Sequence, residues 1–175
     1  MRLAVVAWLL VGCHPYIAAG YDPSAAVHGP LATTMTAPSA QSYDAAIGGG
    51  ARDFTVELGL HAHEVSSQSF ALPSATMTGP RYLTSSASFD VTWTWLRWHH
   101  LSSGLHAGPA AMMLLDRTTG AVDWGKGVRY GARVGVTFSI VTAFVDFSRT
   151  AVGFDGGVAQ GFSDVTGLMV GLELR

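Results

Sequence analysis

Hydrophobic and polar residues alternate along most of the chain from Asp53 to Arg175. A period of two indicates β-strands, because successive side chains of a strand point to opposite faces of the sheet. This pattern predicts an all-β domain at 51–175, an antiparallel up-and-down meander barrel of six to eight strands. The six clearest strands are expected at about 53–64, 85–98, 103–115, 126–139, 141–151 and 164–175.

The strands expected at 126–139 and 141–151 are close enough in sequence to form one hairpin. A two-residue turn at Ile140–Val141 would pair Val134 with Phe147, so that apolar face meets apolar face. This agreement between the two faces supports an antiparallel pair with a short connection.

The connections between the expected strands alternate in length. Those at 65–84, 116–125 and 152–163 are long, and those at 99–102 and 139–142 are short. Barrels of the bacterial outer membrane have short periplasmic turns and longer outer loops. In such a barrel, this alternation would place both chain ends on the periplasmic side.

Composition narrows the class of protein. Of the 175 residues, 13% are charged and 49% are hydrophobic, and the formal net charge is −2. Average soluble domains carry roughly 25% charged residues, and disordered chains combine high charge with few apolar residues. A disordered chain is therefore excluded. The near-neutral balance excludes a basic nucleic-acid-binding surface, and a single cysteine excludes an internal disulfide or a thiolate zinc cluster.

The first 13 residues resemble a targeting sequence. Met1–Arg2 is positively charged, Leu3–Leu10 is apolar, and small residues lead to Cys13. A charged start and a short apolar run are typical of a secretory signal. The run is shorter than the roughly 20 residues of a membrane-spanning helix. The stretch Leu10-Val11-Gly12-Cys13 resembles the lipobox of bacterial lipoproteins.

The lipobox resemblance implies how this end is processed. In that family the signal peptide, here 1–12, is cut off before the cysteine, which receives a diacylglycerol, and the new amine is acylated, for example with palmitate. Cys13 is therefore the expected lipidation site. His14 stands where an aspartate retains enteric lipoproteins in the inner membrane, which implies the outer membrane. The alternative is an ordinary signal peptide cut near Ala18–Ala19.

Residues 14–50 differ from the rest of the chain. Pro, Ser, Ala, Thr and Gly dominate, and no apolar period is visible. This composition predicts that 13–50 is a lipidated N-terminus followed by a flexible linker. Known single-chain barrels of the outer membrane begin at eight strands. The missing pair is therefore expected in 21–50, in 65–84, or from association of chains.

Several features indicate that the apolar face of the sheet is turned toward lipid. The polar face at 126–139 is rich in glycine, which suits a narrow lumen, and the chain has a single lysine, Lys126, although lysine usually protects exposed sheets. Aromatic residues gather at two levels, as in interfacial girdles. The residues concerned are Trp93, Trp95 and Trp98 at one level and Trp124 and Tyr130 at the other. In this pattern 53–175 resembles the small outer-membrane β-barrel proteins.

The opposite orientation of the sheet defines an alternative. A periplasmic lipoprotein with a lipocalin-like barrel would turn its apolar face inward, around an apolar ligand. Trp93, Trp95, Tyr130 and Phe138 would then line the cavity. The two interpretations therefore differ in one observable, the direction in which these four side chains point.

Candidate chemistry lies on the polar face of the sheet. Charges in a narrow interior must pair, or they become neutral. The polar face is therefore expected to form a structural plug of ion pairs. The charged residues on it are Glu57, Asp90, Arg129, Arg133, Asp146 and Glu173.

Seven histidines raise the question of a metal site. His61 and His63 share one face of a strand, and His106 is expected on the same face. Zinc needs three or four ligands at about 2.0–2.1 Å, and hydrogen-bonded polar histidines are the simpler expectation. The G-x-S-x-G nucleophile motif and a phosphate-binding loop are missing from the sequence. No metal, cofactor or catalytic residue is therefore assigned.

Together these features predict a lipid-anchored cell-envelope protein of the bacterial outer membrane. Its expected role is structural, adhesive or accessory, exercised through the long connections, and an enzyme is not expected. The expected partners are membrane lipid, other envelope proteins and further copies of the chain, and nucleic acid is not among them.

Overall fold

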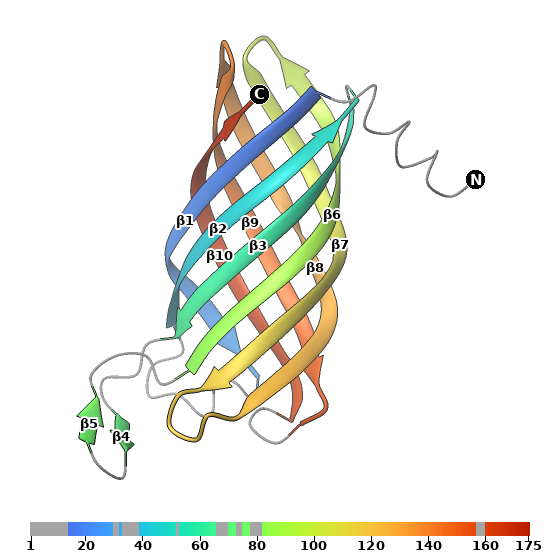
Figure 1. Ribbon diagram of the computed structural model, residues 1–175. Coiled ribbons are helices and arrows are strands. Elements are labelled where there is room, and N and C mark those ends of the chain that lie inside the picture. Colours follow the sequence, from blue (N-terminus) through green and yellow to red (C-terminus); the bar gives the residue numbers. More distant parts are fainter. Residues whose placement is uncertain are drawn as a thin grey trace.

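The computed structural model describes residues 14–29, 32, 39–51, 53–65, 70–72, 75–77, 82–156 and 160–175. Within these residues, eight long strands form one closed antiparallel barrel in the order β1-β10-β9-β8-β7-β6-β3-β2 (Figure 1). Each barrel strand pairs with the barrel strands before and after it in the chain, and β1 closes the sheet against β10. The predicted up-and-down meander barrel is confirmed, with eight strands.

The barrel strands are 12 to 17 residues long. They are β1 (His14–His28), β2 (Ser39–Gly50), β3 (Phe54–Val65), β6 (Tyr82–Trp98), β7 (Leu101–Asp116), β8 (Val122–Phe138), β9 (Val141–Phe154) and β10 (Gly161–Leu174). A separate hairpin of β4 (Phe70–Leu72) and β5 (Ala75–Met77) lies outside the barrel (Figure 1). None of the described residues belongs to a helix that is long and apolar enough to cross a membrane.

Strands β1 and β2 form part of the barrel wall, so the flexible linker predicted at 13–50 is wrong within the described residues. The missing pair of strands lies here. Backbone hydrogen bonds to neighbouring strands keep this segment in the sheet, since β2 pairs with β1 on one side and with β3 on the other. The small residues also have a steric role, because a Cβ at Gly48 would lie 2.5 Å from the ring of Tyr16.

The hairpin of β8 and β9 has the predicted faces but a different register. Val134 pairs with Val145, whereas the predicted turn would have paired it with Phe147. The turn consists of Ser139 and Ile140, and Ser139 adopts a left-handed φ of 58°. The shift amounts to two residues, so every side chain keeps its face. The alternation of apolar and polar residues is therefore the same in both registers.

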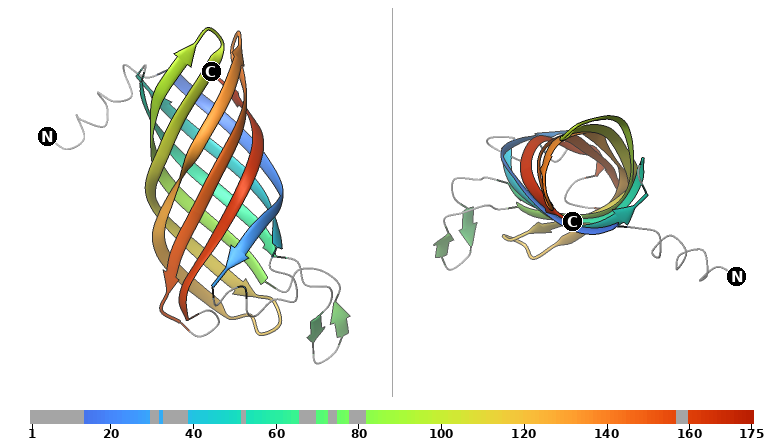
Figure 2. Two further views of the ribbon diagram at one scale, coloured as in Figure 1. Left: turned by 180° about the vertical axis from the view of Figure 1, so that it is seen from behind. Right: turned by 90° about the horizontal axis from the view of Figure 1, so that it is seen from above.

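The two ends of the barrel differ in the length of their connections (Figure 1, Figure 2). The short turns, the start of β1 and the end of β10 share one end, called the short-turn end below. The longer connections share the other, called the long-loop end, as the alternation in the sequence predicts. The short connections are 51–53, 99–100 and 139–140, and the longer ones are 29–38, 66–81, 117–121 and 155–160.

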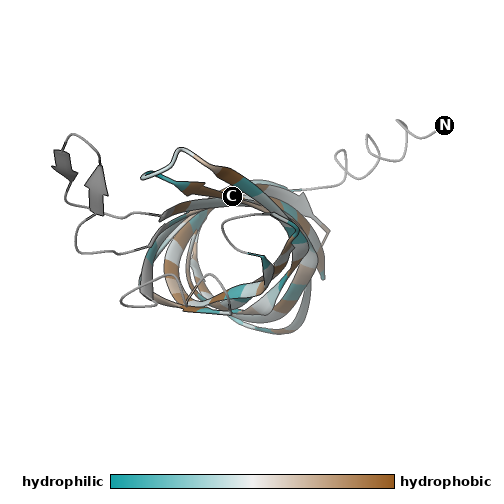
Figure 3. Ribbon diagram, turned by 90° about the horizontal axis from the view of Figure 1, so that it is seen from below, coloured by the Kyte–Doolittle hydropathy of each residue, from teal (hydrophilic) through white to brown (hydrophobic). Residues whose placement is uncertain are grey.

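The outer wall of the barrel is apolar, and apolar and polar residues alternate along the strands (Figure 3). Large hydrophobic side chains on the outside expose between 36% and 66% of their surface. Four of them decide the direction of the apolar face, namely Trp93, Trp95, Tyr130 and Phe138, which are 43% to 64% exposed. The lipocalin-like alternative, in which these side chains line an internal cavity, is therefore wrong.

Candidate functional site

Arg129 is buried inside the lumen and is only 2% exposed. It is an inward-facing residue of β8, where every second side chain points inward. Its Nη1 donates a hydrogen bond to Oδ2 of Asp90 on β6 at 2.7 Å, and its Nη2 donates to Oδ1 of Asp146 on β9 at 3.5 Å. Hydrogen bonds between ionised groups are about twice as strong as neutral ones. Arg129 therefore links three strands of the wall.

Arg133, four residues further along β8, reaches across the lumen to another part of the wall. Its Nη1 and Nη2 donate to the carboxylate oxygens of Glu57 on β3 at 3.0 and 3.3 Å, and its Nε donates to Oδ2 of Asp146 at 2.9 Å. An oxygen of Glu173 on β10 lies 4.0 Å from Nη1. The guanidinium also lies over the ring of Phe144, 4.4 Å from its centroid. Such a contact between a cation and an aromatic ring is attractive.

The structure brings together all six charged residues that the sequence placed on the polar face. Five of them are between 0 and 4% exposed, and Arg133 is the sixth. The six are Glu57, Asp90, Arg129, Arg133, Asp146 and Glu173. Charges that are buried to this extent depend on one another, because a charge that loses its partner in the interior is strongly destabilising. The network joins β3, β6, β8, β9 and β10 across the lumen.

The three histidines that were considered as metal ligands contact separate polar partners. The contacts are His61 Nδ1 with Asp44 Oδ1 at 2.7 Å, His63 Nδ1 with Ser42 Oγ at 2.7 Å, and His106 Nε2 with Asp146 Oδ2 at 3.2 Å. In the part of the chain that the structure describes, no three His, Cys, Asp or Glu side chains are grouped as a metal site. The histidines extend the hydrogen-bond network of the lumen.

Sequence reasoning missed the part of this network that lies on β1 and β2. Tyr16 Oη donates to Oε2 of Glu57 at 2.9 Å, and Asp44 contacts His61. The sequence did offer one signal of a strand here. Ser42 and Asp44 are polar residues two positions apart, and both side chains point inward. This signal was masked because many inward positions of β1 and β2 carry alanine or glycine, so that no polar face stood out against the outward apolar residues.

Apolar side chains fill the long-loop end of the lumen. This buried cluster consists of Ala25, Val27, Met112, Leu114, Val152, Phe154 and Val165. Below it, the cavities among the polar side chains have volumes of only about 40, 20 and 10 Å³. A single water needs roughly 10–15 Å³ by this measure. Side chains therefore fill the middle of the lumen and its long-loop end, as expected for a barrel of eight strands.

The predicted lipidation site, Cys13, and the predicted signal peptide at 1–12 lie outside the described residues. The next residue, His14, is the first residue of β1 at the short-turn end. The rim of this end also carries aromatic side chains, and His100 stacks on Phe138 with ring centroids 5.9 Å apart. The residue that follows Cys13 and an aromatic rim therefore share one end of the barrel.

Comparison with known proteins establishes the fold. No family model matches the chain, and no curated protein matches it in sequence. The solved structure of Neisserial surface protein A (NspA) is similar, with a TM-score of 0.66 and 13% identity over 94% of this chain and 99% of that one. At this identity the similarity shows a shared fold, that of a small eight-stranded β-barrel.

Two further solved barrels share the architecture. Ail, the attachment invasion locus protein of Yersinia pestis, in complex with the heparin analogue sucrose octasulfate, matches with a TM-score of 0.58 and 10% identity, covering 93% of this chain and 97% of that one. The N-terminal β-barrel domain of Pseudomonas aeruginosa OprF matches with a TM-score of 0.50 and 16% identity, covering 91% and 97%. The likeness in each case extends over nearly the whole barrel.

Proposed function

We propose that this chain is a β-barrel protein of the bacterial outer membrane, anchored by lipid at its N-terminus, with a structural, adhesive or accessory role and no catalytic one. A single observation carries this proposal: the barrel is apolar outside and charged inside. In water, burial of apolar surface is the main driving force of folding, which favours the reverse arrangement. In a bilayer the backbone must satisfy its hydrogen bonds internally, which a closed barrel achieves.

The dimensions of the outer wall support a membrane-spanning barrel. On β8 the outward residues from Val128 to Phe138 form an uninterrupted apolar run, which at roughly 3.3 Å per residue extends over about 33 Å. A tilt of about 40° reduces this to a height near 25 Å, the height of the outward apolar band of membrane barrels. At the short-turn end, the exposed side chains of Trp98 and Ile140 suit the membrane interface, where tryptophan is enriched.

We expect the full-length chain to behave as an integral outer-membrane protein. Expressed in a bacterial host that has an outer membrane, it should sediment with outer-membrane vesicles, resist extraction by alkaline carbonate and require detergent for solubilisation. Its mobility on an SDS gel should change on heating, because heat unfolds the barrel. A chain that is soluble and monomeric without detergent would contradict the proposal.

The lipid anchor is proposed on Cys13. Acyl chains attached there would lie beside the apolar wall, because the next residue, His14, begins β1. Each methylene group buried in lipid contributes about 0.8 kcal/mol, so three acyl chains bind firmly. The alternative cleavage near Ala18–Ala19 would remove the start of β1, including the pairing of Ile17 with Leu174. Cleavage before Cys13 leaves the whole strand in place.

The Cys13→Ser variant is expected to lose incorporation of labelled palmitate and to accumulate as the uncleaved precursor, because serine offers no thiol for the diacylglycerol. The measurement is metabolic labelling followed by gel fluorography. His14→Ser is the matched control, since it changes the adjacent residue and leaves the thiol in place, so its labelling should equal that of the wild type. Labelling that persists in Cys13→Ser would exclude this anchor.

The long-loop end is proposed as the side that meets partners outside the cell. If the short-turn end is periplasmic, the β4–β5 hairpin and the turn at 117–121 lie on the outer side of the membrane. Among the similar structures, Ail is an attachment invasion locus protein solved with a heparin analogue, which supports an adhesive role over an enzymatic one. The proposed partners are membrane lipid, other envelope proteins and further copies of the chain.

A further inference from the structure

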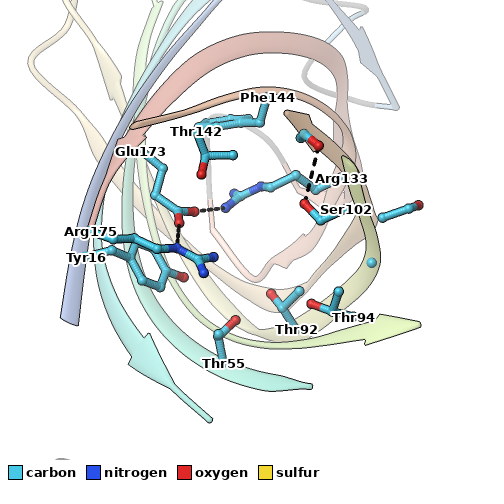
Figure 4. Close-up of a pocket in the computed structure, with 13 residues that line it drawn as sticks. Tyr16, Thr55, Thr92, Thr94, Ser102, Arg133, Thr142, Phe144, Glu173 and Arg175 are labelled. Atoms are coloured by element: carbon cyan, nitrogen blue, oxygen red, sulfur yellow. Dashed lines mark hydrogen bonds and ion pairs between the residues drawn. The ribbon is translucent and has the colours of Figure 1, made fainter. Parts of the chain in front are cut away.

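The lumen opens at the short-turn end into a vestibule lined by hydroxyl and guanidinium groups and by the carboxylate of Glu173 (Figure 4). Two cavities of about 40 and 300 Å³ adjoin there, since Tyr16, Thr55 and Arg175 line both. The outer and larger cavity adds His14 and Arg97. The inner cavity adds the hydroxyl groups of Thr92, Thr94, Ser102 and Thr142. The apolar cluster fills the long-loop end, so the vestibule opens only at the short-turn end of the described barrel.

Arg175 is held at the mouth of this vestibule by three contacts. Its backbone N–H donates to the carbonyl oxygen of Ile140 at 2.9 Å, and its Nε donates to Oε1 of Glu173 at 2.5 Å. Its guanidinium carbon lies 5.9 Å from the centroid of the Tyr16 ring. A guanidinium has five N–H donors. Arg175 therefore keeps donors for a ligand after it has made the bond to Glu173.

Arg97 supplies a positive charge that the network does not balance. It pairs on the ladder with Ser102, which lines the inner cavity, and its side chain lines the outer one. Among the described residues, it takes part in none of the ion pairs. The residues that line the outer cavity include two arginines and His14, and none of them is Asp or Glu. A concave site with positive charge attracts anions.

We propose that this vestibule binds a phosphate-type oxyanion, with Arg97 and Arg175 as charged donors and the hydroxyl of Thr55 as a neutral one. The planar guanidinium fork matches the spacing of phosphate oxygens and binds two of them at once. The anion is either free phosphate or the phosphate of a lipid headgroup at the rim. The headgroup alternative rests on the proposed membrane location, whereas binding of free phosphate does not, because it is measured in detergent.

The test is a calorimetric titration of the full-length protein, folded in zwitterionic detergent, with inorganic phosphate at an ionic strength held constant by sodium chloride. Saturable binding is expected, with about tenfold weaker affinity in Arg97→Gln, since a hydrogen bond to a charged group is lost. Arg149→Gln is the control, because it removes a guanidinium from the outer wall of β9 and leaves the vestibule unchanged. The heat-dependent gel shift verifies that both variants are folded.

A second arm distinguishes the two sources of phosphate. The protein is placed in bilayers of phosphatidylcholine with or without phosphatidylglycerol, and the lipid retained after detergent extraction is measured. Loss of affinity for free phosphate in Arg97→Gln identifies a free anion, whereas loss of retained phosphatidylglycerol alone identifies a headgroup. Absence of saturable binding in both arms, or an Arg97→Gln variant that binds as the wild type does, would overturn the proposal and leave the membrane role unaffected.

Discussion

Replacing Arg129 with methionine is expected to lower the free energy of unfolding by about 3–5 kcal/mol, the usual effect of breaking a buried ion pair from one side. Methionine keeps an apolar stem of similar length but leaves the buried carboxylate of Asp90 without the guanidinium that lies 2.7 Å away. The measurement is urea unfolding of the protein in lipid vesicles, followed by tryptophan fluorescence.

Two further variants test the cause of this loss. In the double variant Arg129→Met with Asp90→Asn, the unpaired charge is removed as well, so part of the stability should return. Arg149→Met is the control, because Arg149 is an exposed residue of the outer wall and contacts Asp164 outside the lumen network. Because the side chain of Arg149 is 44% exposed, the loss of stability should be clearly smaller than at Arg129, although the carboxylate of Asp164 also loses a partner. Equal losses at Arg129 and Arg149 would show that the lumen network does not hold the barrel together.

Replacing Val134 with arginine is expected to destabilise the protein in a bilayer by about 2–4 kcal/mol, the effect of a lipid-facing arginine near the midplane. Val134 lies on the outer wall and is 46% exposed. It stands four residues from Phe138 at the short-turn end. On a tilted strand this places Val134 about 10 Å from that edge of the apolar band, close to the midplane of the bilayer. An arginine at an exposed site of a water-soluble barrel would have almost no effect.

Val122→Arg is the matched control for depth. Val122 lies on the same strand, has nearly the same exposure at 47%, and begins β8 at the long-loop end. Near the interface the same substitution is expected to destabilise by only about 0–1 kcal/mol. Urea unfolding of both variants in vesicles measures the difference directly. Equal effects at the two depths would contradict a barrel that spans a bilayer.

The lumen network and the apolar wall are two consequences of one constraint. A barrel of eight strands has an interior just wide enough for side chains to fill. When the outer face is apolar, alternation along each strand sends the polar residues inward, where charges must pair. Arg129 and Arg133 meet this requirement with Asp90, Asp146 and Glu57. The ion pairs thus occupy the place that an apolar core has in a soluble barrel.

The sequence by itself determined the six later strands, the two faces of each, and the charged residues on the polar face. These are local properties, because the period of two is visible within a few residues. The limit of the sequence appears at β1 and β2, where inward alanines and glycines hide the alternation and the composition suggests a linker. It also appears at the β8–β9 turn, where a shift of two residues leaves the alternation unchanged.

Only the tertiary structure decided which residues meet. Arg133 and Glu57 are 76 positions apart in the chain and join only because the barrel closes on itself. The same closure brings Tyr16 of β1, Arg97 of β6 and Arg175, which follows β10, around one vestibule. The physical reason is that the distance between residues on two separate strands depends on the register of every strand pair between them. Alternation along one strand specifies only the face on which a side chain lies.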